Sequence, residues 1–202
     1  MIVPDLAARV VDSGGRHQPE SLPESLAAQT QIGSLAVAAP SIRLAAGPDA
    51  EAIRTIYNHE VMHTTATFDL VPRSIGDQRL WIAARSGAFA ALVAVHEDVV
   101  VGFGSLSPYK ERAAYRTSVE DSVYVRSDHQ GRGIGKLIVG ELLNVARISG
   151  FHAVFARIAA TSEASRALHA SCGFQLVGIE REVGRKFNRW LDVAIMQALL
   201  PI

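Results

Sequence analysis

The chain of 202 residues is 49% hydrophobic and 20% charged, a composition typical of a globular protein rather than a disordered one. Its 20 basic and 20 acidic side chains balance, which gives no electrostatic reason to expect nucleic acid or an anionic membrane as a partner. Cys172 is the single cysteine, which excludes an intramolecular disulfide and favours a reducing, cytoplasmic location, and no apolar run approaches the roughly 18 residues of a membrane helix.

Residues 1–40 differ in composition from the rest of the chain. They combine prolines, glycines, alanines and polar residues with little apolar periodicity. Such a segment buries too little apolar area to offset its chain entropy, so we expect a flexible N-terminal extension. It lacks a basic start followed by an apolar core, which argues against a secretory signal. One folded domain is expected over residues 41–202.

The remaining sequence alternates between strand and helix patterns. Pro48 suits a first helical turn, and Gly150 is a usual helix stop. The resulting β-α-α-β-β-β-α-β-α-β-β order predicts a mixed α/β domain around one central sheet. In chain order the patterns predict a strand at 41–45, helices at 48–62 and 74–85, strands at 89–96, 99–106 and 115–125, a helix at 133–149, a strand at 151–158, a helix at 162–172, and strands at 174–179 and 189–199.

The first predicted helix ends in His59-Glu60-Val61-Met62-His63, which matches the H-E-x-x-H pattern of zinc hydrolases. Two histidines four residues apart can share one metal ion while the intervening glutamate activates water. The segment after His63 is β-branched and polar, so the second ligand would lie on a frayed turn, and no third ligand follows in a recognisable pattern. We therefore expect no metal, and the favoured interpretation is a polar helix face beside an active-site loop.

Residues 120–136 form the segment around which the predicted domain is organised. Val123-Tyr124-Val125 predicts a strand, and an apolar stripe from Ile134 onward predicts a helix. Glycines between them open the backbone to a ligand, and the free N–H groups of a first helical turn suit a phosphate. The spacing fits neither a dinucleotide fingerprint, whose third glycine would come one residue later, nor a Walker A loop, which needs glycine where Gln130 stands.

The pattern Gln130-x-x-Gly133-x-Gly135 after the strand at 123–125 resembles the pyrophosphate loop of the GCN5-related N-acetyltransferases (GNAT). The resemblance implies acetyl-CoA as co-substrate and a GNAT fold, in which helices flank a central, mixed, mostly antiparallel twisted sheet. It also implies that an N–H near Val125 is free for the thioester oxygen. The residues that it assigns to acetyl-CoA are Val123, Tyr124, Val125, Gln130, Gly131, Arg132, Gly133, Ile134, Gly135, Lys136 and Ser162, the last standing where the family commonly has asparagine.

One branch of that superfamily is similar over residues 41–200. The stretches Tyr57-Asn58-His59-Glu60, 64–68, 109–115, 120–125 and Leu168-His169 resemble the phosphinothricin and methionine sulfoximine acetyltransferases. This resemblance implies acetyl transfer to the α-amine of a small amino acid or analogue, such as phosphinothricin, methionine sulfoximine or methionine sulfone. It also implies a homodimer.

Two residues are expected to act in catalysis. The amine of a free amino acid is mostly protonated at neutral pH, so a base is needed, and the family pattern places it at Glu120, acting directly or through a water. A strand-end glutamate held in a salt bridge is the alternative interpretation. By strand alternation Glu120, Ser122 and Tyr124 share one face of the sheet. The resemblance implies that His169 stabilises the oxyanion or donates a proton to the departing thiolate.

The acceptor is expected to be held by a basic, aromatic segment. Arginine can clamp a carboxylate or phosphinate with two hydrogen bonds, and lysine adds a point charge. The resemblance assigns this role to Lys110, Arg112 and Tyr115, and an aromatic pocket wall to Phe68. A solvated basic turn is the alternative. Phe187 and Trp190 are expected to complete the pocket or a dimer contact.

Other functions remain open on the sequence. Within the enzyme class, protein N-termini or a polyamine could be the acceptor, although a basic segment favours an anionic small molecule over a cationic one. A non-catalytic acyl-CoA sensor would bind the donor without turnover. The zinc hydrolase suggested by residues 59–63 is the remote alternative.

Overall fold

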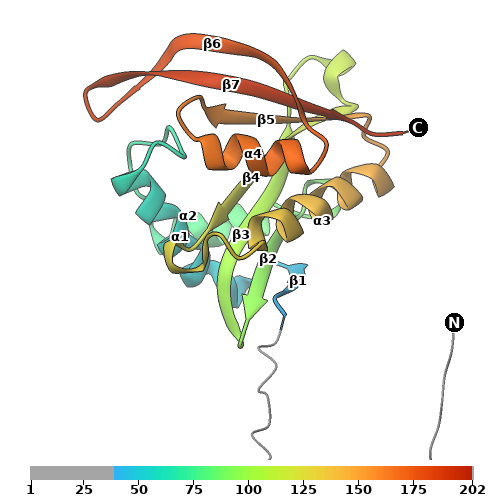
Figure 1. Ribbon diagram of the computed structural model, residues 1–202. Helices are drawn as coiled ribbons and strands as arrows, with labels where there is room; N and C mark the ends of the chain where they lie inside the picture. The colour runs from blue at the N-terminus through green and yellow to red at the C-terminus, as the bar shows by residue number, and fades with distance from the viewer. Residues whose placement is uncertain (1–38, 202) are drawn as a thin grey trace, which may run out of the picture. The chain divides into compact units, whose positions relative to one another are not determined.

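The computed structural model describes residues 39–201 (Figure 1). The predicted N-terminal extension lies outside the described residues apart from residues 39 and 40, and the structure does not bear on it. The predicted order of elements and the mixed α/β class are confirmed. The elements are β1 (Ser41–Leu44), α1 (Ala50–His63), α2 (Ile75–Ala83), β2 (Ala91–His96), β3 (Val99–Pro108), β4 (Ser118–Val125), α3 (Ile134–Ile148), β5 (Ala153–Ala159), α4 (Glu163–Ser171), β6 (Gln175–Lys186) and β7 (Arg189–Leu199).

The strands form one seven-stranded sheet in the order β1-β2-β3-β4-β5-β7-β6. The β4–β5 pair is parallel, and the other pairs among the described strands are antiparallel, so the sheet is mostly antiparallel as predicted. The register of β3 on β4 places Phe103 opposite Tyr124, Ser105 opposite Ser122, and Ser107 opposite Glu120.

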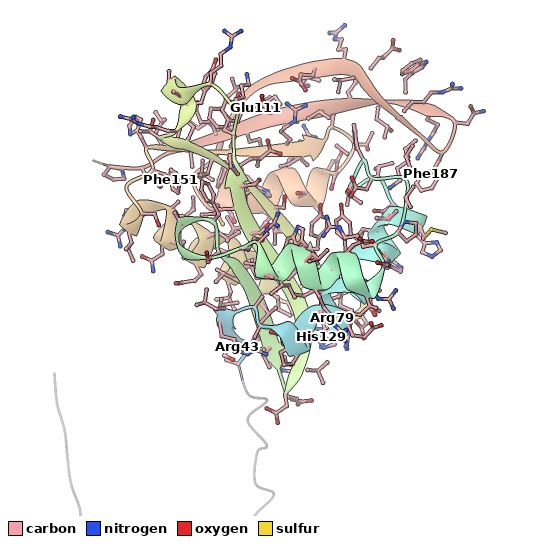
Figure 2. The ribbon with its side chains drawn as sticks, turned by 180° about the vertical axis from the view of Figure 1, so that it is seen from behind. Arg43, Arg79, Glu111, His129, Phe151 and Phe187 are labelled. Carbon is pink, nitrogen blue, oxygen red and sulfur yellow. The ribbon has the colours of Figure 1, made fainter. Side chains whose placement is uncertain are left out.

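Helices cover both faces of the sheet, and a separate apolar cluster lies under each pair of helices (Figures 1 and 2). On one face, Ile138 and Leu142 of α3 are fully buried against the strands, and Leu168 and Cys172 from the α4 region pack beside them. On the other face, Ile53 of α1 packs with residues of α2 and with Phe103 and Tyr124 of the sheet. The site described below is lined mainly by β4, β5, the α4 region and the loop after α1.

Two predicted boundaries were wrong by more than two residues. The central strand begins at Ser118 rather than near residue 115, because residues 113–115 form a 3-10 turn closed by the N–H of Tyr115 on the carbonyl of Arg112 (2.9 Å). Strand β6 continues to Lys186, beyond the predicted end at residue 179, because the hairpin turn needs only Phe187 and Asn188, both with positive φ. Among the described helices none is long and apolar enough to span a membrane.

Candidate active site

The central feature of the site is the divergence of β4 from β5. Their parallel pairing covers only Ser118–Glu120 against Ala153–Phe155, although β4 continues to Val125 and β5 to Ala159. Past Glu120 the two strands are unpaired with each other, and a cavity of about 270 Å³ lies between them.

Backbone donors of β4 point into this gap. The N–H of Arg126 donates to the Val101 carbonyl of β3 at 2.9 Å. Successive residues of a strand point their N–H groups to opposite sides, so those of Val123 and Val125 point away from β3 and toward the gap. They remain available to a ligand.

The cavity brings together residues predicted for catalysis, for acetyl-CoA binding and for acceptor binding. It is floored by β4, walled by β5 and α4, and closed by the loop between α1 and α2. Predicted site residues that line it are Phe68, Glu120, Val123, Tyr124, Ser162 and His169. Ser162 precedes α4 and caps it without a side-chain hydrogen bond, which leaves its hydroxyl free for another partner.

Glu120 lies where the two strands part. Its carboxylate makes no hydrogen bond to another residue of the described chain. Burial raises the pKa of Glu120 above its usual value; Arg157 opposes this shift, and the charges of Asp121 and Glu180 add to it. Arg157 is itself engaged in an ion pair with Glu180. A glutamate of raised pKa is a better proton acceptor than an exposed one.

His169 lies on the α4 wall with both ring nitrogens engaged. Its Nδ1 is 2.8 Å from the carbonyl of Ser165, which can only accept, so Nδ1 carries the hydrogen. Its Nε2 is 3.2 Å from Oδ2 of Asp121, and both side chains are buried. Burial lowers the pKa of His169, but the hydrogen bond and charge of Asp121 outweigh burial, and the net pKa is raised.

The glycine-rich loop joins β4 to α3. Gly131 and Gly133 have φ of +74° and +80°, a conformation that side chains disfavour, and Gly133 is the N-cap of α3. Gln130 donates from Nε2 to the Val125 carbonyl at 3.1 Å and so ties the loop to the end of β4. Arg132 and Lys136 are exposed beside it, which gives an anion both first-turn N–H groups and two cations.

Gly135 also has a role in packing. A Cβ at this position would lie 2.9 Å from Cδ2 of Leu168. Its missing side chain therefore lets α3 approach α4.

The loop that closes the cavity is held by residues that sequence reasoning did not assign to the site. Tyr57 Oη donates to Asp69 at 2.5 Å and lies 3.0 Å from Oγ1 of Thr67. Asn58 exchanges two hydrogen bonds with the backbone of Arg73, at 2.8 and 2.9 Å. The Tyr57-Asn58 stretch carried the family resemblance, and it was the available signal for this loop.

Lys186 holds the same loop from β6. Its buried ammonium donates to the carbonyls of Thr67 (2.7 Å) and Glu60 (3.3 Å), and burial lowers its pKa. Next to it, Gly184 accommodates the Phe68 ring, which a Cβ there would overlap. Nothing in the sequence around residue 186 indicated a buried lysine.

The predicted acceptor segment lies apart from the cavity. Lys110, Arg112 and Tyr115 line their own surface depression together with Glu111. Figure 2 shows Glu111 well separated from Phe187 at the tip of the β6–β7 hairpin. These three residues therefore line a different depression from the cavity that holds Glu120. Phe187 and Trp190 are exposed and do not line the cavity either.

The H-E-x-x-H segment has no metal-site geometry. His59 and His63 are exposed, with ring centroids 5.0 Å apart, and the Glu60 carboxylate accepts a hydrogen bond from Thr64 at 2.6 Å. Within residues 39–201 no group of three potential ligands is placed to hold a metal ion. The segment serves the closing loop instead, because Thr64 and Lys186 both bind Glu60.

A strand that diverges from its parallel neighbour, with a carboxylate at the branch and an anion-binding turn at its end, suits acyl transfer from a phosphate-bearing donor. A family model described as an acetyltransferase (GNAT) domain matches residues 42–195. The chain belongs to the GNAT acetyltransferase family.

Three individual relatives show which acetyltransferases this chain is similar to. The chain is 38% identical over 161 residues to the L-amino acid N-acyltransferase MnaT of Escherichia coli (strain K12), covering 79% of this chain and 94% of that protein. A phosphinothricin acetyltransferase from Sinorhizobium meliloti, solved in complex with acetyl-CoA, is 35% identical with a TM-score of 0.77 over 80% of this chain and 88% of that one. A ribosomal-protein-alanine N-acetyltransferase from Brucella melitensis is 39% identical with a TM-score of 0.77, covering 79% and 99%.

Proposed function

We propose that this protein transfers the acetyl group of acetyl-CoA to the α-amine of a small amino acid or analogue, such as phosphinothricin, methionine sulfoximine or methionine sulfone. The observation that carries the proposal is the parting of β4 and β5 at Glu120, which places a carboxylate of raised pKa, free backbone donors and an anion-binding turn along one strand. The names of the amino acid acyltransferase and phosphinothricin acetyltransferase relatives support this acceptor class.

Acetyl-CoA, when bound, supplies a thioester with an electrophilic acetyl carbon and a pyrophosphate. The residues present fit both groups. First-turn N–H groups of α3, with Arg132 and Lys136, would hold the pyrophosphate. The N–H groups of Val123 and Val125 would bind the amides of the pantetheine arm and the thioester oxygen, and the hydroxyl of Ser162 faces the same cavity.

Glu120 is the proposed base that takes a proton from the acceptor ammonium, directly or through a water. His169 is the proposed source of a proton for the departing thiolate. Its Nε2–H faces Asp121 in this structure, so donation requires that hydrogen bond to be exchanged for the sulfur. In the alternative role, His169 stabilises the oxyanion as an imidazolium held in place by Asp121.

Phe68, Lys110, Arg112 and Tyr115 remain the proposed acceptor-binding residues. Phe68 lines the cavity. The other three would need to reach an acceptor from their surface depression, either by movement of the segment or from a second copy of the chain. A homodimer is therefore part of the proposal, and the exposed apolar side chains of β6, such as Leu176 and Val177, support it. Its test is sedimentation equilibrium. We also propose a cytoplasmic location, where acetyl-CoA is present and the single cysteine, Cys172, stays reduced.

A second candidate acceptor is a protein N-terminus that begins with alanine, favoured by the likeness to the ribosomal-protein-alanine acetyltransferase. Thiol release from acetyl-CoA distinguishes these two acceptor classes. The acceptors to be compared are phosphinothricin, methionine sulfoximine, methionine sulfone, common L-amino acids, spermidine and a peptide starting with alanine. Turnover confined to the small amino acids supports the proposal, and turnover of the peptide alone replaces it with the second candidate. Donor binding without turnover of any amine indicates a sensor.

A further inference from the structure

A second, smaller cavity of about 80 Å³ lies under α1 and α2, next to the one described above. The two cavities share Ser122 and Tyr124 of β4. The walls of the small cavity are aromatic, its floor is formed by serines of β3 and β4, and two cations enter it. The polar residues concerned are Arg73, Arg85, Ser105, Ser107 and Ser122.

Arg85 is a half-buried cation without an acidic partner. Its guanidinium stacks on the Trp81 ring, 3.7 Å from the centroid, and Nη1 donates to the Trp81 carbonyl at 3.2 Å. Its Nε is buried and has no hydrogen-bond partner, and among the described residues no carboxylate lies within 4 Å of Arg85. Burial, and then the charge of Arg73, lowers its pKa to about 10, so it still carries its charge at neutral pH.

Arg73 adds a second positive charge with little compensation. Its guanidinium lies over the Tyr57 ring, 3.7 Å from the centroid, and its closest acidic atom is Oδ2 of Asp69 at 3.8 Å. Its N–H donates to Oδ1 of Asn58 and its carbonyl accepts from Nδ2 of Asn58, and these two hydrogen bonds fix its backbone. Two guanidiniums that line one cavity, with one carboxylate 3.8 Å from Arg73, favour an anion in the space that they share.

The position of this space relative to Glu120 fits an amino acid. Glu120 and Ser122 lie on one face of β4, two residues and about 6.6 Å apart along the strand. An acceptor whose amine reaches Glu120 would therefore extend its anionic group over Ser122, below Arg85 and Arg73. Lys110 and Arg112 do not line this cavity.

We propose that Arg85, assisted by Arg73, binds the α-carboxylate of the acceptor and so selects free amino acids over their amides. This inference rests on the proposed function, because it assumes an amino acid acceptor at Glu120. It assigns the carboxylate to the small cavity and leaves the segment at 110–115 for the remainder of the acceptor.

The test compares methionine sulfone with methionine sulfone amide, which lacks the carboxylate charge. Loss of a charged hydrogen-bond pair in Arg85→Gln should raise the KM for the free acid about 10- to 100-fold and leave kcat, and the KM for the amide, nearly unchanged. Arg85→Lys should recover part of the loss. The matched control is Arg79→Gln, on the exposed side of α2, which should leave both KM values unchanged.

Direct binding separates this inference from the proposed function. Calorimetric titration of methionine sulfone, in the presence of CoA, reports on Arg85 even where turnover is absent. Binding to the wild type that is lost in Arg85→Gln but kept in Arg79→Gln supports the site, whether or not acetyl transfer follows. Equal binding by the wild type and Arg85→Gln, or no binding to the wild type, overturns it. A parallel loss for acid and amide would mean that Arg85 only supports the fold.

Discussion

Nε2 of His169 lies 3.2 Å from Oδ2 of Asp121, and the two side chains are only 3% and 1% exposed. Asp121 follows Glu120 on β4, so this pair ties α4 to the strand that carries the proposed base. The position of the α4 wall and the position of Glu120 are therefore mechanically linked.

This pair predicts a pH dependence of folding stability. Asp121 raises the pKa of His169 above its ordinary 6.5, despite burial. A raised folded-state pKa gives stability that is fully present below the unfolded pKa and is lost as pH rises through the folded value. The free energy of unfolding should thus fall above pH 6.5 in the wild type. Asp121→Asn should be about 3–5 kcal/mol less stable at pH 6 and lose this slope. Urea unfolding at pH 6 to 9 measures both, and an unchanged slope in the variant would contradict the assignment.

Removal of the Glu120 charge should impair proton transfer from the acceptor amine without affecting the binding of acetyl-CoA. Glu120→Gln is expected to lower kcat by about 10²- to 10⁴-fold, the usual contribution of a general base, while the Kd of acetyl-CoA stays the same. Steady-state kinetics and calorimetry provide the two values. If Glu120→Gln kept the kcat of the wild type, Glu120 would not be the base.

The pH profile offers a finer test of the same residue. Glu180 raises the pKa of Glu120 through its charge and also engages Arg157, which lowers it. Glu180→Gln should therefore shift the acidic limb of kcat/KM to lower pH while leaving the maximum close to the wild-type value. A shift toward higher pH would show that another group sets that limb.

Gly184 should determine the position of Phe68. An added Cβ overlaps the Phe68 ring, so Gly184→Ala is expected to displace the ring and raise the acceptor KM by about tenfold, a free-energy change of about 1.4 kcal/mol. Gly178→Ala on the same strand meets no atom within 4 Å and serves as the control. Initial rates at saturating acetyl-CoA measure the effect, and equal KM values in the two variants would dissociate Phe68 from acceptor binding.

Gly133 should be needed for the binding of acetyl-CoA. Its φ of +80° costs a residue with a Cβ about 1–2 kcal/mol, so Gly133→Ala should distort the start of α3 and raise the KM for acetyl-CoA several-fold, with the acceptor KM unchanged. Gly140→Ala within the same helix has open space around it and should be neutral or stabilising. A larger effect at position 140 than at 133 would contradict the assigned anion site.

Local patterns sufficed for the order of elements and for the glycine-rich turn, because strand alternation, helical periodicity and positive-φ glycines are written in neighbouring residues. They also placed Glu120, Ser122 and Tyr124 on one face, in agreement with the β3–β4 register, which pairs them with every second residue of β3. A free N–H near Val125, which the parting of β4 and β5 provides, was expected only from the family resemblance.

Relationships across long sequence separations were not accessible in this way. Lys186 meets the carbonyls of Thr67 and Glu60 more than a hundred residues away, and its burial depends on those two acceptors rather than on its neighbours. Arg85 is the last residue of a predicted helix, and its place in a cavity lined by β3 and β4 becomes visible only in the folded chain. Lys110 and Arg112 carried a family motif, yet in the structure they line a depression separate from the cavity that holds Glu120.

The parting of β4 from β5 also creates unsatisfied strand edges in the interior of a sheet, where most proteins have none. Such edges are templates for the backbone of another chain. A pantetheine arm carries amides and can occupy this position as a substitute strand, in the manner of β-augmentation. The donor would then protect the enzyme from self-association as well as supply the acetyl group, and protein purified without it should aggregate more readily on heating.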